Sequence, residues 1–270
     1  MACVFPGAPD LEAYWHNIVS GIDAITDVPP GRWDPEVFFD PNSSAGDRLY
    51  CKRGGYLGDL AQFNPLEYGI MPIALDGGEP AQLLSLRVAH EALADAGYAE
   101  RPFNRDRAEI IFGYGSYLSR GHANRMMHTI GIEQTLQILK TLHPEYTAEE
   151  LEAIKKELKA SLPSFGPDTA GSMIPNLMTG RIANRLDLMG ANFTVDAACA
   201  SSLIATDLAV RDLRAYRCDL ALVGAVHLST HVPFLSVFCH LNALSRQSQI
   251  RPFDENAEGL LLKNSRGSRI

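Results

Sequence analysis

The stretch "FTVDAACASSLIATDLAV", from Phe193 to Val210, places one cysteine between two kinds of secondary structure. The β-branched and aromatic residues before Asp196 predict a strand, and the small and apolar residues from about Ser201 predict a helix. Cys199 lies at the corner between them. The chemistry of the chain depends on whether this thiol fills a core or is exposed as a nucleophile.

A thiol at a strand-to-helix corner has physical reasons to react. The first N–H groups of a helix lack intrahelical partners and carry the positive end of the helix dipole. They favour a thiolate and can receive the oxyanion of a tetrahedral acyl intermediate, so the corner resembles a nucleophile elbow with sulfur in place of oxygen. Free cysteine is also among the most buried residue types, so a structural thiol stays open as the alternative.

The rest of the chain alternates strand and helix patterns. Buried strands are predicted around "AEIIFGYGSY" and "CDLALVGAVHLS", and helical spacing from Leu83 to Ala96 lies between Pro80 and Gly97. A first short helix is predicted after Asp10. This alternation is typical of an α/β fold in which helices cover a sheet.

The segment 133–160 differs in character, because it is charged, amphipathic and interrupted at Pro144. Thr147 and Glu150 have the spacing of a capping box, in which each side chain bonds the free N–H of the other residue. We expect two solvated helices that leave the core.

Composition excludes several classes of protein. The 270 residues carry a formal net charge of -8 with both signs dispersed, which argues against a nucleic-acid-binding face. Five widely spaced cysteines and the lack of a C-x-x-C pair argue against a disulfide scaffold or a zinc site and fit a cytoplasmic setting. No apolar run is long enough to span a membrane, and the N-terminus lacks the pattern of a signal peptide.

Several motifs together resemble one family. "VDAACASSLIA" is similar to the active-site segment of β-ketoacyl synthases, the condensing enzymes of fatty acid and polyketide assembly. The same order and spacing hold for "MACVFPGAPDLEAYWHNIVSGIDAITDVPPGRWD", "GGYLGDLAQFNPLEYGI", "LLSLRVAHEALADAGY", "GRIANRLDLMGANFTVDAACASS" and "ALSRQSQIRPFDENAEG". The resemblance covers residues 1–262 and implies the first, N-terminal half of a thiolase-like fold, with a mixed sheet and helices on its faces. "DAACASS" and the insert at 133–160 indicate the iterative, multidomain type, similar to polyunsaturated fatty acid and heterocyst glycolipid synthases.

The resemblance implies a role for Cys199. This cysteine would accept an acyl chain as a thioester from the phosphopantetheine arm of an acyl carrier protein, for condensation with malonyl-carrier. No tightly bound cofactor and no metal are implied, and the intact domain is expected to be a homodimer. Within the family, two histidines in the motifs H-G-T-x-T and K-x-N-x-G-H complete the condensation.

Neither histidine motif occurs in this sequence, and none of its eight histidines has the neighbours that the motifs require. The family's first strand is largely missing before Met1, and the residues 263–270 diverge from the family pattern. That divergence is typical of a frameshift, an altered reading of the gene or a fragment boundary. We therefore expect a segment that is incomplete as a catalyst by itself.

Two other functions stay open. One is an inactive, truncated product that survives as a dimerising or carrier-binding fragment. The other is a thiolase acting on coenzyme A esters, which shares the fold and the cysteine, although "DAACASS" and "RPFDENAEG" favour the synthase.

Overall fold

The computed structural model describes residues 1–75, 78–262 and 265–269. The chain forms two compact units. We call residues 1–63, 80–116 and 175–270 the sheet unit, and residues 64–79 and 117–174 the helical unit. Each unit is described by itself.

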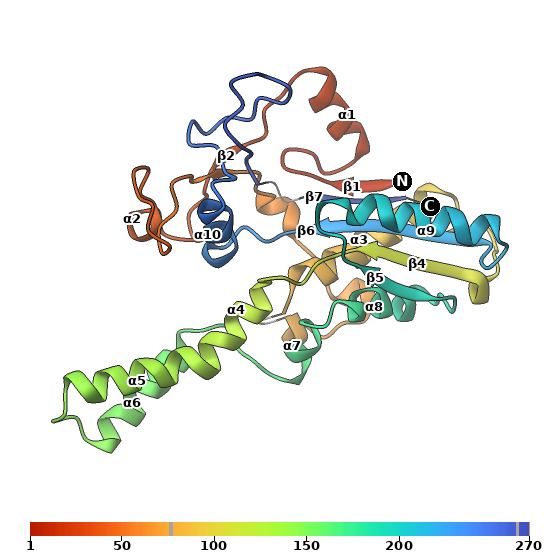
Figure 1. The fold of residues 1–270 in the computed structure, drawn as a ribbon. Coiled ribbons are helices and arrows are strands. Elements are labelled where there is room, and N and C mark those ends of the chain that lie inside the picture. Colours follow the sequence, from red (N-terminus) through yellow and green to blue (C-terminus); the bar gives the residue numbers. More distant parts are fainter. Residues whose placement is uncertain (76–77, 263–264, 270) are drawn as a thin grey trace. The chain divides into compact units, whose positions relative to one another are not determined.

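The sheet unit is built on a five-stranded mixed sheet with the order β1-β7-β6-β4-β5 (Figure 1). β4 is parallel to both of its neighbours, whereas β7 is antiparallel to β6 and to β1. The mixed sheet predicted from the sequence is confirmed. Its strands are β1 (Ala2–Val4), β4 (Ala108–Gly113), β5 (Asn192–Val195), β6 (Leu220–His227) and β7 (Ser265–Arg269).

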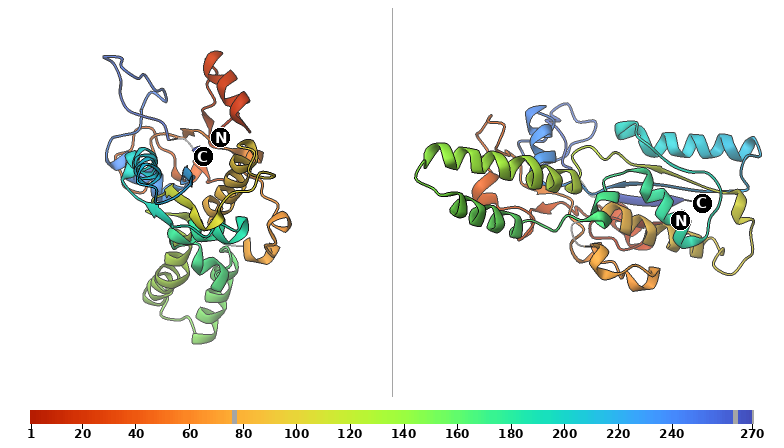
Figure 2. Two further views of the ribbon diagram at one scale, coloured as in Figure 1. Left: turned by 90° about the vertical axis from the view of Figure 1, so that its right-hand side faces the viewer. Right: turned by 90° about the horizontal axis from the view of Figure 1, so that it is seen from below.

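Helices cover both faces of this sheet. α9 (Ser201–Arg214) packs on β4 and β6, while α3 (Pro80–Asp95) packs on β1, β6 and β7 and contacts α8 (Asn176–Leu186). Figure 2 shows α9 on one side of the strands and α3 with α8 on the other. Because successive strand residues point to opposite faces, Ile111 of β4 meets α9 while Ile110 and Phe112 point away from it.

α3 follows the predicted pattern closely. Pro80 occupies its first turn, where a missing N–H costs nothing, and Gly97 beyond its end has a φ of +77°. Its buried side chains form a broad apolar stripe: Ala81, Leu83, Leu84, Leu86, Val88, Ala89, Ala92 and Leu93. The predicted helix is confirmed.

The remaining elements of the sheet unit are short. α1 (Leu11–Val19) begins at Asp10, whose carboxylate accepts the Ala13 N–H at 2.8 Å, and so the predicted first helix is confirmed. β2 (Thr26–Asp27) pairs with β3 (Arg53–Gly54), and α2 (Pro35–Phe38) lies between them in the chain. Trp33 anchors the long loop in a second core that includes Leu235 and Cys239 of α10 (Val232–His240), a helix that the sequence did not predict. Short 3₁₀ turns occur at Gly58–Ala61 (η1) and Arg105–Arg107 (η4).

The helical unit contains the charged segment as an antiparallel pair of helices, α5 (Ile132–Leu142) and α6 (Ala148–Ala160). Thr147 and Glu150 form the expected capping box, and Lys155 of α6 forms an ion pair with Glu133 of α5. The two predicted helices are thus present. The unit also contains η2 (Leu66–Tyr68), η3 (Pro72–Leu75), α4 (Arg120–Met126), the π-helical turn η5 (Met127–Gly131) and α7 (Pro167–Gly171).

Both ends of the chain contribute strands to the sheet, since β7 pairs with β1 and with β6. The boundary of a divergent tail at about residue 263 stays a prediction, and residues 263, 264 and 270 of that tail lie outside the described residues. Among the described helices, none combines the length and the hydropathy that a membrane span requires.

Glu109 is a buried carboxyl on the α9 face of β4. Its side chain hydrogen-bonds with Asp212 of α9 and with the thiol of Cys218, while its Oε2 atom has no partner among the described residues. Burial raises the pKa of Glu109 above its usual range, and the nearby Asp212 carboxylate adds to that shift. The folded chain therefore holds a proton on Glu109 more strongly than the unfolded chain does.

The substitution Glu109→Gln tests this coupling. Because the folded-state pKa is raised, the stabilisation from Glu109 is complete in acid and is lost as the pH rises through that pKa. Glutamine does not titrate, so we expect a Tm above that of the native chain by roughly 2–4 °C at pH 7 and no difference near pH 4. Thermal unfolding at both pH values measures this. The exposed Glu100→Gln should change neither Tm, and a Glu109→Gln chain that is less stable at pH 7 would contradict the burial argument.

Candidate active site

Cys199 lies in a single 3₁₀ turn, η6 (Ala198–Ala200), which joins the end of β5 to the start of α9. Figure 1 shows this junction at the C-terminal ends of the parallel strands β4 and β5, where both arrows point. Residues 196–200 are all exposed. The strand, corner and helix predicted around Cys199 are therefore present, and the thiol reaches solvent.

Two side chains hold the corner in place. The Ser201 hydroxyl accepts the Ala197 N–H at 2.8 Å and donates to the Ala198 carbonyl at 2.7 Å, so it ties the two residues before Cys199 to the first residue of α9. The Asp196 carboxylate accepts the Ala198 N–H at 3.0 Å. These hydrogen bonds fix the backbone that leads into Cys199 without using the cysteine itself.

The residue before the cysteine is in an unusual backbone conformation. Ala198 has a φ of +48°, in the left-handed region that non-glycine residues rarely adopt. Such a residue costs about 1–3 kcal/mol and persists only when its surroundings hold it, which here include the hydrogen bonds to Asp196 and Ser201. In this corner the strained residue precedes the thiol, so the chain turns sharply just before it.

Two glycines that follow one another closely at the end of β4 let the corner approach the sheet. A Cβ on Gly113 would lie 2.7 Å from the carbonyl carbon of Ser201, and a Cβ on Gly115 would lie 2.9 Å from Asp196 Oδ2. The buried residues of α9, Ser201, Ala205 and Ala209, are also small. The start of α9 consequently rests directly on β4, where no side chain separates them.

The other four cysteines differ from Cys199, because they are buried. Burial raises the pKa of Cys3 and of Cys218 to about 11, and it raises the pKa of Cys51 and of Cys239 as well. A thiol with a raised pKa forms little thiolate at neutral pH and reacts slowly. Exposure thus separates Cys199 from the other thiols of the chain.

The sequence predicts no catalytic role for any of the eight histidines. His227 ends β6, where burial lowers the pKa of its imidazole and leaves its Nε2 atom without a hydrogen-bond partner among the described residues. His231 occupies the position just before α10 without a side-chain capping hydrogen bond, and its ring lies 6.4 Å from the ring of Phe234. We assign a catalytic role to neither histidine.

The site therefore consists of one presented thiol and the backbone around it. Within the described ranges, no group of three or more His, Cys, Asp or Glu side chains is arranged to hold a metal ion. An exposed thiol beside the first turn of a 14-residue helix is suited to covalent catalysis through a thioester or thiol adduct.

Sequence reasoning singled out Cys199 but missed the residues that position it. The glycines in "FGYGS" were visible at the end of a predicted strand, yet their contact with α9 is made only in the folded sheet. Asp196 lies two residues before Ala198, and Ser201 lies four residues after Ala197. Such short spacings are typical of local hydrogen bonds between a side chain and the backbone.

Comparison with known proteins adds independent information. A family model described as "Beta-ketoacyl synthase, N-terminal domain" matches residues 1–265. Among curated proteins, the chain is 29% identical over 264 residues to a polyunsaturated fatty acid synthase of Thraustochytrium, and it covers 9% of that protein. It is 32% identical to a phenolphthiocerol/phthiocerol polyketide synthase of Mycobacterium tuberculosis, of which it covers 12%. These alignments include 97% of this chain, which spans about a tenth of each relative.

Solved structures agree in fold. The ketosynthase from module 6 of the bacillaene synthase of Bacillus subtilis matches 99% of this chain with a TM-score of 0.73 and 26% identity, and 38% of that protein is covered. The oxazolomycin ketosynthase domain from Streptomyces albus has the same TM-score at 24% identity, with 41% of that chain covered. The predicted thiolase-like α/β fold is confirmed.

Replacing Ser201 with alanine tests the support of the corner. The variant leaves the Ala197 N–H and the Ala198 carbonyl without their shared partner, so we expect the free energy of unfolding to fall by about 1 kcal/mol. The Ala197 amide should also exchange with deuterium faster, as measured by hydrogen exchange on the peptide that spans residues 193–200. Ser202→Ala is the control, because Ser202 is exposed on the next position of the same helix. Equal exchange in the two variants would show that Ser201 does not hold the turn.

Proposed function

The chain belongs to the β-ketoacyl synthase family, and on this basis we propose that it is a ketosynthase segment in which Cys199 accepts an acyl chain as a thioester. One observation carries the proposal. Of the five cysteines, Cys199 alone is exposed, and it stands on a turn that Ser201 and Asp196 hold between a strand and a helix. The family match over residues 1–265 supports the same assignment.

The proposed step is a transfer between two sulfur atoms. The Cys199 thiolate attacks the carbonyl carbon of an acyl thioester, a tetrahedral oxyanion forms, and the bond from that carbon to the donor sulfur breaks. The donor leaves as a thiol after it takes up a proton, and the acyl group stays on Cys199. The first turn of α9 lies beside the reacting atoms, where its N–H dipoles stabilise negative charge.

The identity of the acyl donor is inferred from the family. We infer that an acyl carrier protein presents the acyl chain on phosphopantetheine and that malonyl-carrier is the second substrate. The relatives named as polyketide and polyunsaturated fatty acid synthases support carrier-linked substrates. No tightly bound cofactor is needed for the transfer, and we infer a homodimer for the intact domain.

Condensation requires more than this thiol. Decarboxylation of malonyl-carrier leaves an enolate, which in the family is stabilised by two histidines of H-G-T-x-T and K-x-N-x-G-H motifs. Neither motif occurs in the 270 residues. We therefore propose that this chain takes up the acyl group and that residues outside these 270 supply the condensation step.

Acyl transfer to the purified chain tests the proposal. Incubation with an acyl-carrier thioester should raise the mass of the chain by one acyl group, located on Cys199 by peptide mapping. Cys199→Ala should lose this adduct completely, whereas Cys218→Ala, which removes a buried thiol, should keep it. Addition of malonyl-carrier should yield no β-ketoacyl product.

The remaining outcomes decide between the alternatives. An adduct on a cysteine other than Cys199, or none at all, would overturn the assignment and favour a fragment without acyl-transfer activity. Acylation from an acyl-coenzyme A ester but not from acyl-carrier would favour the thiolase alternative. Turnover to a β-ketoacyl product by this chain alone would contradict the need for the missing histidines.

A further inference from the structure

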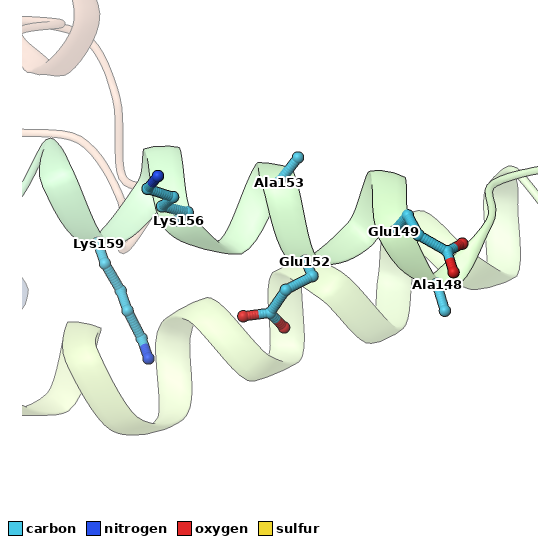
Figure 3. A pocket seen from close by; sticks show the side chains of 6 residues that line it. All are labelled: Ala148, Glu149, Glu152, Ala153, Lys156 and Lys159. Carbon is cyan, nitrogen blue, oxygen red and sulfur yellow. The ribbon is translucent and has the colours of Figure 1, made fainter.

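The outward face of α6 is an ordinary solvated helix surface. A shallow hollow of about 590 Å³ on it is lined by Ala148, Glu149, Glu152, Ala153, Lys156 and Lys159. Figure 3 shows the charged side chains spread along the helix without converging on one point. The hollow therefore has no set of groups that would recognise a ligand.

A chain of hydrogen bonds in the sheet unit joins three elements near the C-terminal end of α9. The Cys218 thiol, in the turn before β6, donates to the Glu109 carboxyl group of β4. Glu109 also hydrogen-bonds with Asp212 in the last turn of α9. Asp212 Oδ1 in turn accepts from Arg217 Nη1 at 3.0 Å. We call the contact between Glu109 and Asp212 the carboxyl pair, and it ties α9 to the sheet.

Burial restricts the carboxyl pair to one negative charge. Glu109 is only 4% exposed, and its Oε2 atom has no hydrogen-bond partner among the described residues, so no donor is in place to stabilise a carboxylate there. Two carboxylates in contact repel each other, whereas one proton shared between them forms a hydrogen bond. In the closed arrangement, Glu109 therefore carries the proton and Asp212 carries the charge that pairs with Arg217.

The surroundings of Glu109 set the pH range in which this proton is held. Burial has the largest effect and raises the pKa of Glu109 above its usual range. Asp212 of α9 opposes a negative charge on this carboxyl, whereas Arg217 and the Cys218 thiol favour it. Ala221 of β6, which is paired with Glu109 across the sheet, is apolar. The proton is therefore held in acid and is lost as the pH rises through the folded-state pKa.

A separate set of bonds holds the turn before β6. Arg107, which precedes β4, forms an ion pair with Asp219 at 2.9 Å from Nε to Oδ1, and its Nη2 atom donates to the Tyr216 carbonyl at 2.6 Å. Cys218 lies in this turn and belongs to the same buried cluster as Ala209 of α9. Loss of the carboxyl pair would thus free the last turn of α9 while the turn before β6 stays attached.

We propose that the carboxyl pair is a pH-operated latch that keeps the last turn of α9 closed over Cys218. In the closed latch, one proton lies between Glu109 and Asp212. When that proton passes to a water molecule, two carboxylates face each other in a buried place, so the last turn of α9 moves away from the sheet. The Cys218 thiol then becomes accessible to solvent.

Two buried thiols allow the latch to be measured in the full native chain. Burial raises the pKa of both Cys3 and Cys218 to about 11, so the ratio of their alkylation rates largely cancels thiol ionisation. Cys3 lies in β1, which two strands separate from β4. With excess iodoacetamide, each thiol reacts only through transient opening. The rate for Cys218 relative to Cys3 should rise roughly tenfold or more between about pH 6 and pH 9, because loss of one proton opens the latch.

The variant Glu109→Gln removes the titration but keeps a hydrogen-bond donor. Its amide can still donate to Asp212 and has no proton to lose in this pH range, so the ratio of rates should stay constant. Asp219→Asn is the matched control, because it makes the same acid-to-amide change in the neighbouring ion pair, and here the rise should remain. An equal rise in Glu109→Gln, or a constant ratio in the native chain or in Asp219→Asn, would overturn the proposal.

Hydrogen exchange on the native chain gives a measurement that depends on neither variant. The peptide that spans residues 208–214 should exchange faster, relative to a peptide within α3, as the pH rises over the same range. Base-catalysed exchange accelerates both peptides alike, so it cancels in the comparison. Unchanged relative exchange would show that the last turn of α9 stays closed and would overturn the latch.

Discussion

The contact between Gly113 and the first residue of α9 is the constraint on which the site depends. With no side chain at Gly113, the backbone of Ser201 rests against the end of β4, and the small residues Ala205 and Ala209 continue this close packing along the helix. The helix axis and the sheet are thereby fixed together. The corner that holds Cys199 leads from β5 directly into that helix, so its position is set by the same contact.

The Cys199 corner contains a strained backbone residue that nearby hydrogen bonds hold in place. Ala198 adopts a left-handed backbone, which the hydrogen bonds to Asp196 and Ser201 hold in place. The result is an exposed thiol on a turn that hydrogen bonds hold, while the four remaining thiols are buried. The proposed acyl transfer to Cys199 relies on this arrangement, because a turn that is already held needs no rearrangement when a substrate arrives.

The periodicity of the sequence predicted most of the fold, because most of its helices and strands leave an apolar or capping pattern in the local sequence. α3, β4, β6, the α5–α6 pair and the Cys199 corner all have clear apolar or capping patterns. α10 was missed because its apolar run includes Pro233 and has few polar positions to show a period. β7 was missed because "SRGSR" lacks a strand pattern, and its pairing with β1 and β6 depends on backbone bonds to distant segments. The bracing of the thiol by Asp196 and Ser201 likewise follows from the folded turn.

The central claim is that this chain presents one reactive thiol. Alkylation of the folded chain with limiting iodoacetamide, followed by peptide mapping, tests it directly. We predict that Cys199 is modified first and that Cys3, Cys51, Cys218 and Cys239 react only after unfolding. Modification of any of these four at a rate equal to that of Cys199 in the folded chain would contradict the claim.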